Sequence, residues 1–217
     1  MSAGTAPGGA SALAGFLSRH PEFQLVHDSA GEPEFIMAAA GNLALDADRL
    51  RARLFEGLSV PILHQQLSGT VARVLEARLG EACGGELSPQ KLLSLGADRM
   101  RALGLSASKA RALLGLSEEV ASGKLELESL LEMDDEAVTA RLCELWGLGP
   151  WSAHMFLLFT LGRMDVWAPA DLGVRKGYAK LYELEDLPSA RELALQKERY
   201  SPSASIATWY LWRVLEL

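Results

Sequence analysis

Apolar residues at helical spacing are the feature that most limits how this chain of 217 residues can fold. From Asp46 onward they recur mostly every three or four positions, which places them on one face of an α-helix. The first members of this series are Leu50, Leu54, Leu58, Ile62, Leu63, Leu67, Val71, Val74 and Leu75. No strand patterns alternate with the helical segments, which argues against a doubly wound sheet. The sequence therefore predicts an all-α protein with many short helices.

Several residues mark where individual helices begin. Pro61 predicts a break between two helices, because a proline ring fits only the first turn of a helix. Ser88, Ser106 and Asp134 precede helical segments and can cap them, since their side-chain oxygens can accept from the first free amides. The markedly apolar residues 151–161 predict a helix that is buried on most sides.

The first fifty residues carry different signals. Residues 1–10 are small and uncharged, which predicts a flexible N-terminus without the basic and apolar regions of a secretory signal. Residues 11–20 can form a short helix. Residues 22–27 and 34–39 flank a turn-like segment and indicate a β-hairpin.

The composition favours a packed globular protein, with 49% apolar and 23% charged residues. No apolar run reaches the roughly 18 residues that a membrane span needs, so we expect no membrane association. Cys83 and Cys143 match no metal-ligand spacing and indicate a reduced compartment. We therefore expect a cytoplasmic location of bacterial type, in the cytosol or nucleoid.

The net charge of −7 disfavours nucleic acid as a partner, because phosphate affinity comes from Lys and Arg. The charge is unevenly distributed, however. Residues 118–136 hold eight acidic residues and one lysine, whereas residues 141–180 hold five basic and three acidic residues. Because a groove responds to the local field, the overall acidity does not exclude a DNA partner.

The residues most informative about chemistry form the sequence LWGLGPWSA over positions 145–153. Gly147 and Gly149 can form a tight turn whose backbone N–H groups face a phosphate at the start of the next helix. Glycine spacing alone is more typical of an ordinary turn between two helices than of a phosphate site. The fuller pattern is more specific, because most of its positions are constrained and Ser152 can cap the helix or donate.

Asp171 is the second informative residue, because it follows Pro169 closely and precedes another helical segment. Taken alone, it fits a simple helix N-cap. Capping and catalysis are compatible here, since a helix N-terminus favours a negative charge.

The pattern over residues 145–153 resembles the helix-hairpin-helix superfamily of DNA glycosylases, and within it the 3-methyladenine DNA glycosylase II group. The resemblance extends from about Arg51 to the C-terminus, whereas the first fifty residues match poorly. The other segments similar to that superfamily are residues 62–68, 103–110, 166–175 and 207–212.

The resemblance implies an all-α fold of two helical subdomains, with a helix-hairpin-helix motif and a DNA-binding cleft between them. One subdomain would span residues 61–171 and carry the motif. The other would be discontinuous and combine residues 11–60 with residues 172–217.

The resemblance also implies a monofunctional DNA glycosylase that flips alkylated bases out of duplex DNA and excises them by hydrolysis in base excision repair. It assigns catalysis to Asp171, whose carboxylate would stabilise positive charge on the sugar and orient the attacking water. Trp151 occupies the position where bifunctional members carry a lysine, and an indole cannot form a Schiff base. Asp165 is interpreted as a structural capping or loop residue.

Further site residues follow from the same resemblance. Gln66 matches the wedge that fills the gap left by a flipped nucleotide, although a pair of solvated glutamines at a helix start explains Gln65 and Gln66 equally well. The residues expected to contact DNA are Gln65, Gln66, Gly147, Gly149, Trp151 and Ser152. The residues expected to bind the base are Trp151, Met155 and Trp212.

No cofactor is expected apart from a structural monovalent cation. The backbone carbonyls of Cys143, Leu145 and Leu148 would bind that cation, which bridges to a phosphate in this family. Two cysteines cannot hold an iron–sulfur cluster.

Where the family usually offers basic residues, this chain has Ser201, Ser203 and Ser205, which can donate to phosphates. The expected partner is double-stranded DNA, bound by a monomer. Two other functions stay open, namely a DNA-binding protein that has lost its chemistry and an all-α protein-interaction domain.

Overall fold

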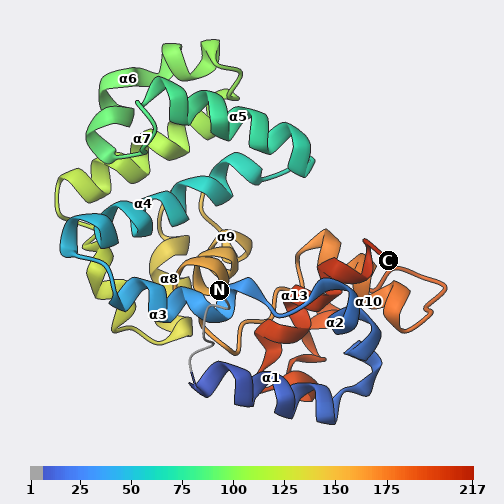
Figure 1. Ribbon diagram of the computed structural model, residues 1–217. Helices are drawn as coiled ribbons and strands as arrows, with labels where there is room; N and C mark the ends of the chain where they lie inside the picture. The colour runs from blue at the N-terminus through green and yellow to red at the C-terminus, as the bar shows by residue number, and fades with distance from the viewer. Residues whose placement is uncertain (1–6) are drawn as a thin grey trace. The chain divides into compact units, whose positions relative to one another are not determined.

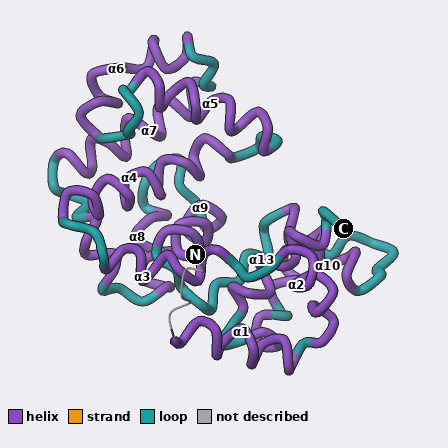
Figure 2. The backbone as a smooth tube through the Cα atoms, in the orientation of Figure 1, coloured by secondary structure: helices purple, strands orange, loops and turns teal. Residues whose placement is uncertain are grey.

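The computed structural model describes the backbone of residues 7–217 and the side chains of all of these except residues 7–10, 37, 39, 40 and 43. This part of the chain is helical and contains no strand (Figure 1, Figure 2). The predicted all-α class is confirmed. Of the segment predicted to be flexible, residues 1–6 lie outside the described residues, and residues 7–10 belong to a helix.

The chain divides into two compact units, each with its own core. The first unit combines the described part of Met1–Leu43 with Leu157–Leu217, and the second unit is Ala44–Phe156. The discontinuous subdomain expected from the sequence has its boundaries at residue 60 and residue 171, which lie further along the chain than the boundaries of these units.

The second unit is built from six α-helices and a short 3-10 segment. These elements are α4 (Ala47–His64), α5 (Gly69–Ala82), α6 (Pro89–Ala102), α7 (Ala107–Ala121), η3 (Leu127–Leu131), α8 (Asp135–Cys143) and α9 (Pro150–Met155). Helices α6 and α7 lie side by side, and α4 contacts α5, α7 and α9 (Figure 1). The apolar series that begins at Leu50 supplies much of this core, because Leu54, Leu58 and Ile62 are almost fully buried.

The predicted caps are confirmed. The Ser106 hydroxyl accepts from the amide of Lys109, and the Asp134 carboxylate accepts from the amide of Ala137. Ser88 caps α6 in the same way. These contacts are local, so the sequence could specify them without knowledge of the fold.

The predicted break at Pro61 is wrong, because α4 continues through the proline to His64. Pro61 has no N–H to donate within the helix, which costs about 3 kcal/mol in an exposed helix interior. Here Pro61, Ile62 and Leu63 are all buried. Their burial against neighbouring helices outweighs the lost hydrogen bond.

The first unit joins helices from both ends of the chain. Its N-terminal elements are α1 (Pro7–Arg19), η1 (Pro21–Phe23), α2 (Gln24–Ala30), η2 (Glu34–Met37) and α3 (Ala38–Leu43). After the π-helical segment η4 (Phe156–Thr160), its C-terminal helices are α10 (Leu172–Leu181), α11 (Ala190–Ala194), α12 (Lys197–Tyr200) and α13 (Ala204–Val214).

The predicted β-hairpin near the N-terminus is wrong, since residues 22–27 and 34–37 are helical. Phe23 and Val26 are three positions apart and both buried, as on one face of a helix, whereas Leu25 is exposed. The Phe23 ring lies 6.0 Å from the Tyr210 ring of α13. These aromatic contacts make the N-terminal helices part of the same core as the C-terminal helices.

Helices α10 and α13 approach each other closely at Gly177. A Cβ atom at this position would overlap the backbone carbonyl of Leu211. The absence of a side chain at Gly177 therefore sets the distance between the helix that begins at Asp171 and the helix that carries Trp212.

Gly177→Ala is expected to lower the free energy of unfolding by about 1–3 kcal/mol, because backbone atoms must move to make room. Gly115→Ala in α7 is the matched control, since no neighbouring atom lies within 4 Å of the added Cβ. That control should keep or raise stability, because alanine is the better helix former. Urea unfolding measures both variants, and equal stability of the two would contradict the close approach.

Candidate functional site

The turn between α8 and α9 adopts a conformation that requires glycine. Gly147 has φ +88°, in the left-handed region, and a Cβ there would lie 2.5 Å from the Cβ of Ala112 on α7. Leu145 and Leu148 are buried, and the Leu148 amide donates to the Leu145 carbonyl over 3.1 Å. The turn is therefore packed on α7 at Gly147 and anchored by the two buried leucines.

Gly149 is the N-cap of α9 and has an extended backbone, and no neighbouring atom lies within 4 Å of the position that a Cβ would take there. Open space therefore lies beside the first turn of α9. Trp151 is half-buried in this turn, and Ser152 is almost fully buried.

Gln65 connects the end of α4 to the hairpin. Its Nε2 atom donates to the carbonyl of Gly147 and to the Oγ of Ser152, both over 2.9 Å. The structure thus brings together three residues that were predicted to contact DNA. In this structure Gln65 acts as an internal support for the hairpin.

Gln66 directly follows and is exposed, with a left-handed φ of +58°. A residue other than glycine in this region costs about 1–3 kcal/mol and persists only when its surroundings enforce it. The side chain predicted to be the wedge therefore stands at a strained backbone position at the end of α4.

Asp171 is the N-cap of α10 in the first unit. Its Oδ1 atom accepts from the Val174 amide over 2.8 Å and from the Trp212 Nε1 over 2.8 Å. Gly173 permits the second contact, because a Cβ at that position would lie 2.7 Å from Cδ1 of Trp212. The carboxylate is half-buried and fixed by one backbone and one side-chain donor.

Trp212 is also covered by a residue that the sequence analysis did not single out. The Phe159 ring stacks on the Trp212 ring with centroids 5.5 Å apart, and Phe159 is 42% exposed. Phe159 stands in the apolar run that predicted a buried helix, so its exposure was not evident from the pattern. An aromatic pair thus lies next to Asp171.

The three residues predicted to bind the base fall in different units. Trp151 and Met155 belong to the second unit, where Met155 is buried. Trp212 belongs to the first unit, where its indole contacts Asp171.

Among the residues predicted to bind a cation, Cys143 ends α8, where backbone carbonyls lack helical partners. The Leu145 carbonyl accepts one hydrogen bond from Leu148, which leaves it a second lone pair. Among the described side chains, no three His, Cys, Asp or Glu residues are grouped as they would be around a metal ion.

Asp165 has the structural role that was predicted for it. Its carboxylate accepts from the Ser201 hydroxyl and from the Ala204 amide, which begins α13. The prediction for the three serines needs correction, because Ser203 and Ser205 are buried. The Ser205 hydroxyl donates to the Arg163 carbonyl and accepts from the Val166 amide, so it is used within the protein.

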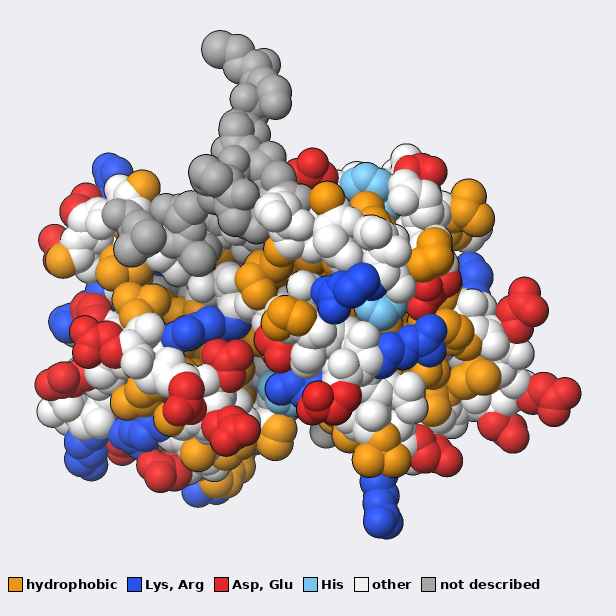
Figure 3. Space-filling model, turned by 90° about the horizontal axis from the view of Figure 1, so that it is seen from below, with side chains coloured by type: hydrophobic (Ala, Val, Ile, Leu, Met, Phe, Trp, Pro, Cys, Tyr) orange, Lys and Arg blue, Asp and Glu red, His pale blue; other side chains and the backbone are white. Residues whose placement is uncertain are grey.

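Charged side chains of both signs are mixed on the surface, as the face drawn in Figure 3 shows. At the hairpin, the Arg111 guanidinium lies 4.1 Å from the centre of the Trp146 ring, which is 50% exposed. This contact holds a cation beside the hairpin in a protein with net negative charge. Arg111 could not be identified from the sequence, because only the fold brings α7 to the hairpin.

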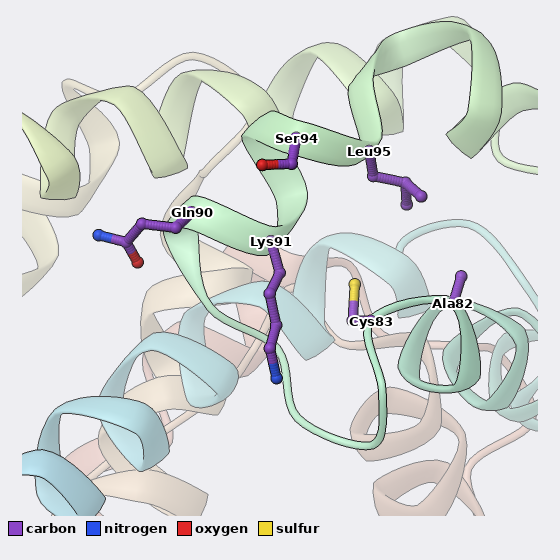
Figure 4. A pocket seen from close by; sticks show the side chains of 6 residues that line it. All are labelled: Ala82, Cys83, Gln90, Lys91, Ser94 and Leu95. Carbon is purple, nitrogen blue, oxygen red and sulfur yellow. The ribbon is translucent and has the colours of Figure 1, made fainter.

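A pocket of about 370 Å³ lies elsewhere in the second unit, between the end of α5 and the start of α6 (Figure 4). It contains none of the predicted site residues. The Cys83 thiol in its lining is buried, and this burial raises its pKa, which disfavours the reactive thiolate.

The comparison with protein families matches residues 60–202 to the HhH-GPD superfamily, described as base excision DNA repair proteins. The chain belongs to this superfamily. The match includes the hairpin and Asp171, and it confirms the resemblance identified in the sequence.

None of the helices described over residues 7–217 combines the length and hydropathy of a membrane span.

Two relatives bear closely related names. DNA-3-methyladenine glycosylase 1 of Schizosaccharomyces pombe is 28% identical, over 84% of this chain and 81% of its own length. DNA-3-methyladenine glycosylase of Saccharomyces cerevisiae is 31% identical over 75% of this chain, which spans only 57% of that relative. A third relative, from Bacillus subtilis, is 31% identical to this chain. This chain spans only 56% of that relative's length.

A solved structure shows the same fold. The 3-methyladenine DNA glycosylase of Schizosaccharomyces pombe in complex with abasic DNA matches with a TM-score of 0.73 and 27% identity. The alignment covers 90% of this chain and 96% of that chain.

Gly147→Ala is expected to destabilise the second unit by about 1–3 kcal/mol, because the added Cβ meets Ala112 and the left-handed backbone becomes strained. Gly149→Ala is the control and should cost less than about 1 kcal/mol, the loss typical of a weaker helix cap. Thermal and urea unfolding compare the two variants. Equal losses would contradict the seating of the hairpin on α7.

Proposed function

We propose that this chain is a monofunctional DNA glycosylase, which removes alkylated bases from duplex DNA by hydrolysis and leaves the sugar–phosphate backbone intact. The observation that carries the proposal is the carboxylate of Asp171, fixed by the Val174 amide and the Trp212 indole in a chain of the HhH-GPD superfamily. The names of the relatives support alkylated bases as the substrate class.

The reaction breaks the bond between C1′ of the deoxyribose and the base nitrogen, and the electron pair leaves with the base. An alkylated purine that carries a positive charge departs as a neutral base, while positive charge builds on the sugar. A negative carboxylate that is already in place stabilises this charge without reorganisation. Asp171 then orients the water that adds to C1′ and accepts the proton which that water loses.

Trp151 supports the monofunctional assignment. It occupies the position at which strand-cleaving members of the superfamily carry a lysine, and an indole has no amine to form a Schiff base with C1′. Water is therefore the nucleophile, and the product is an abasic site.

The hairpin would bind the DNA backbone. The backbone N–H groups of Gly147, Gly149 and Trp151 would donate to a phosphate beside the open space at the first turn of α9. Ser152 would contribute through its contact with Gln65, which supports the hairpin. The carbonyls of Cys143, Leu145 and Leu148 would bind a monovalent cation that bridges to a phosphate.

The target base would be flipped out of the stack and bound by Trp151, Met155 and Trp212. Aromatic faces attract cationic rings, which suits alkylated purines. Gln66 would fill the gap in the duplex, since an enzyme that acts on a base must keep the duplex open. We further propose that the protein acts as a monomer on double-stranded DNA in the cytoplasm.

Asp171→Asn tests the catalytic assignment most simply. Asparagine keeps an oxygen for both N–H donors but lacks the negative charge, so folding and DNA binding should persist. Release of free base from methylated duplex DNA should fall by about a hundredfold or more. Asp46→Asn, which makes the same change at the N-cap of α4, is the control and should excise as wild type does.

Other outcomes of this experiment separate the alternatives. Equal release by wild type and Asp171→Asn would remove Asp171 from the mechanism. Binding of duplex DNA without base release by either protein would indicate a binding protein that has lost its chemistry. Absence of DNA binding at low salt would favour a protein-interaction domain.

Gln66→Ala tests the wedge. The variant should excise a lesion in a paired position more slowly than wild type, by about tenfold, because nothing replaces the flipped nucleotide. A lesion in a mismatch is already unpaired and should be excised at a rate closer to that of wild type. Single-turnover base release measures both rates, and equal losses on the two duplexes would count against the wedge.

A further inference from the structure

Lys109 lies at the start of α7, and its side chain reaches across to the end of α4. Its Nζ atom donates to the carbonyls of Ile62, Leu63 and Gln65, over 2.6, 2.8 and 2.8 Å. An ammonium group has three protons, so these three hydrogen bonds use all of them. All three protons of the Lys109 ammonium group are therefore bound to backbone carbonyls.

These contacts complete the hydrogen bonding of the end of α4. The last carbonyls of a helix have no partner within it. Here the Pro61 carbonyl accepts from the Gln65 amide, and the His64 carbonyl accepts from the Leu67 amide. Lys109 supplies the donors for the remaining carbonyls between Pro61 and Gln65.

The ammonium is bound by carbonyl dipoles in a partly desolvated place. Burial lowers the pKa of Lys109. The negative end of the α4 dipole offsets this desolvation and favours the charged form. A neutral side chain of similar length would leave three carbonyls without donors, which is costly in a buried position.

Gln65 is thereby fixed at two points. Its carbonyl accepts from Lys109, and its side-chain amide donates to Gly147 and Ser152 of the hairpin. Gln66 is the next residue and has the strained φ of +58°. Because Gln65 is fixed at its carbonyl and at its side-chain amide, the direction in which the backbone enters Gln66 is fixed as well.

We propose that Lys109 is a positioning residue, which holds Gln66 in its left-handed conformation and at a fixed place relative to the hairpin. This inference rests on the proposed function and names a residue outside its catalytic and DNA-contacting set. The end of α4, the start of α7 and the hairpin then act as one rigid support for the wedge.

Lys109→Met tests this, because methionine keeps the apolar stem and has no donors. The variant should excise a paired lesion about tenfold more slowly than wild type and a mismatched lesion less than about threefold more slowly. In a Gln66→Ala background, the same substitution should leave the ratio of the two rates unchanged, since the residue through which Lys109 acts is gone.

Lys91→Met is the matched control. Lys91 stands at the same position of α6 as Lys109 does of α7, with its amide also donating to the capping serine. Its Nζ donates to the carbonyl of Glu86 near the surface. This variant should keep both excision rates within about twofold of wild type, as expected for a surface substitution.

Hydrogen exchange provides a readout that does not depend on activity. The amides of Gln65 and Leu67 should lose protection in Lys109→Met and keep it in Lys91→Met. If wild type excises no base, the proposed function fails while this exchange result still decides the role of Lys109. If Lys109→Met does not fold, Lys109→Arg, which keeps the charge, should fold and show intermediate protection.

Two results would overturn the inference. One is unchanged protection together with an unchanged ratio of excision rates in Lys109→Met. The other is an equal loss on both duplexes with a salt slope of DNA binding reduced by about one, which would make Lys109 a phosphate contact.

Discussion

In both units, glycine residues let neighbouring segments approach closely, because glycine has no Cβ. These close approaches determine where the candidate site residues lie. Gly147 lets the hairpin sit directly on Ala112 of α7, and Gly173 lets the Trp212 indole reach Asp171. Gly177 sets the distance between α10 and α13. The hydrogen bonds that define the site depend on these approaches, because a donor displaced by an ångström no longer reaches its acceptor.

The polar contacts then fix two groups with different tasks. The Asp171 carboxylate caps α10 and accepts from the Trp212 indole, so one residue serves both the fold and the proposed chemistry. Lys109 and Gln65 fix the end of α4 and leave Gln66 exposed in a strained conformation. Strain of this kind is common where a side chain must project in one direction for function. The chain thus uses partly buried polar contacts to hold the half-buried Asp171 and the exposed Gln66 in place.

Local signals made part of this structure predictable. The helical spacing and the cap at Asp134 depend only on neighbouring residues, and the structure confirms both. The break expected at Pro61 failed because burial, which depends on distant helices, outweighed a local preference. The hairpin expected near Phe23 failed because a buried pair three positions apart fits a helix better than a strand. The partners of Gln65 and Lys109 lie tens of residues away, so no local pattern could identify them.

The central claim is that the negative charge of Asp171 stabilises positive charge on the sugar. The most direct measurement compares binding of two duplexes, one with a protonated pyrrolidine in place of the deoxyribose and one with an uncharged tetrahydrofuran. Wild type should prefer the cationic duplex by about tenfold or more, because it resembles the transition state, and Asp171→Asn should lose that preference. A preference that survives in Asp171→Asn, or its absence in wild type, would contradict the account.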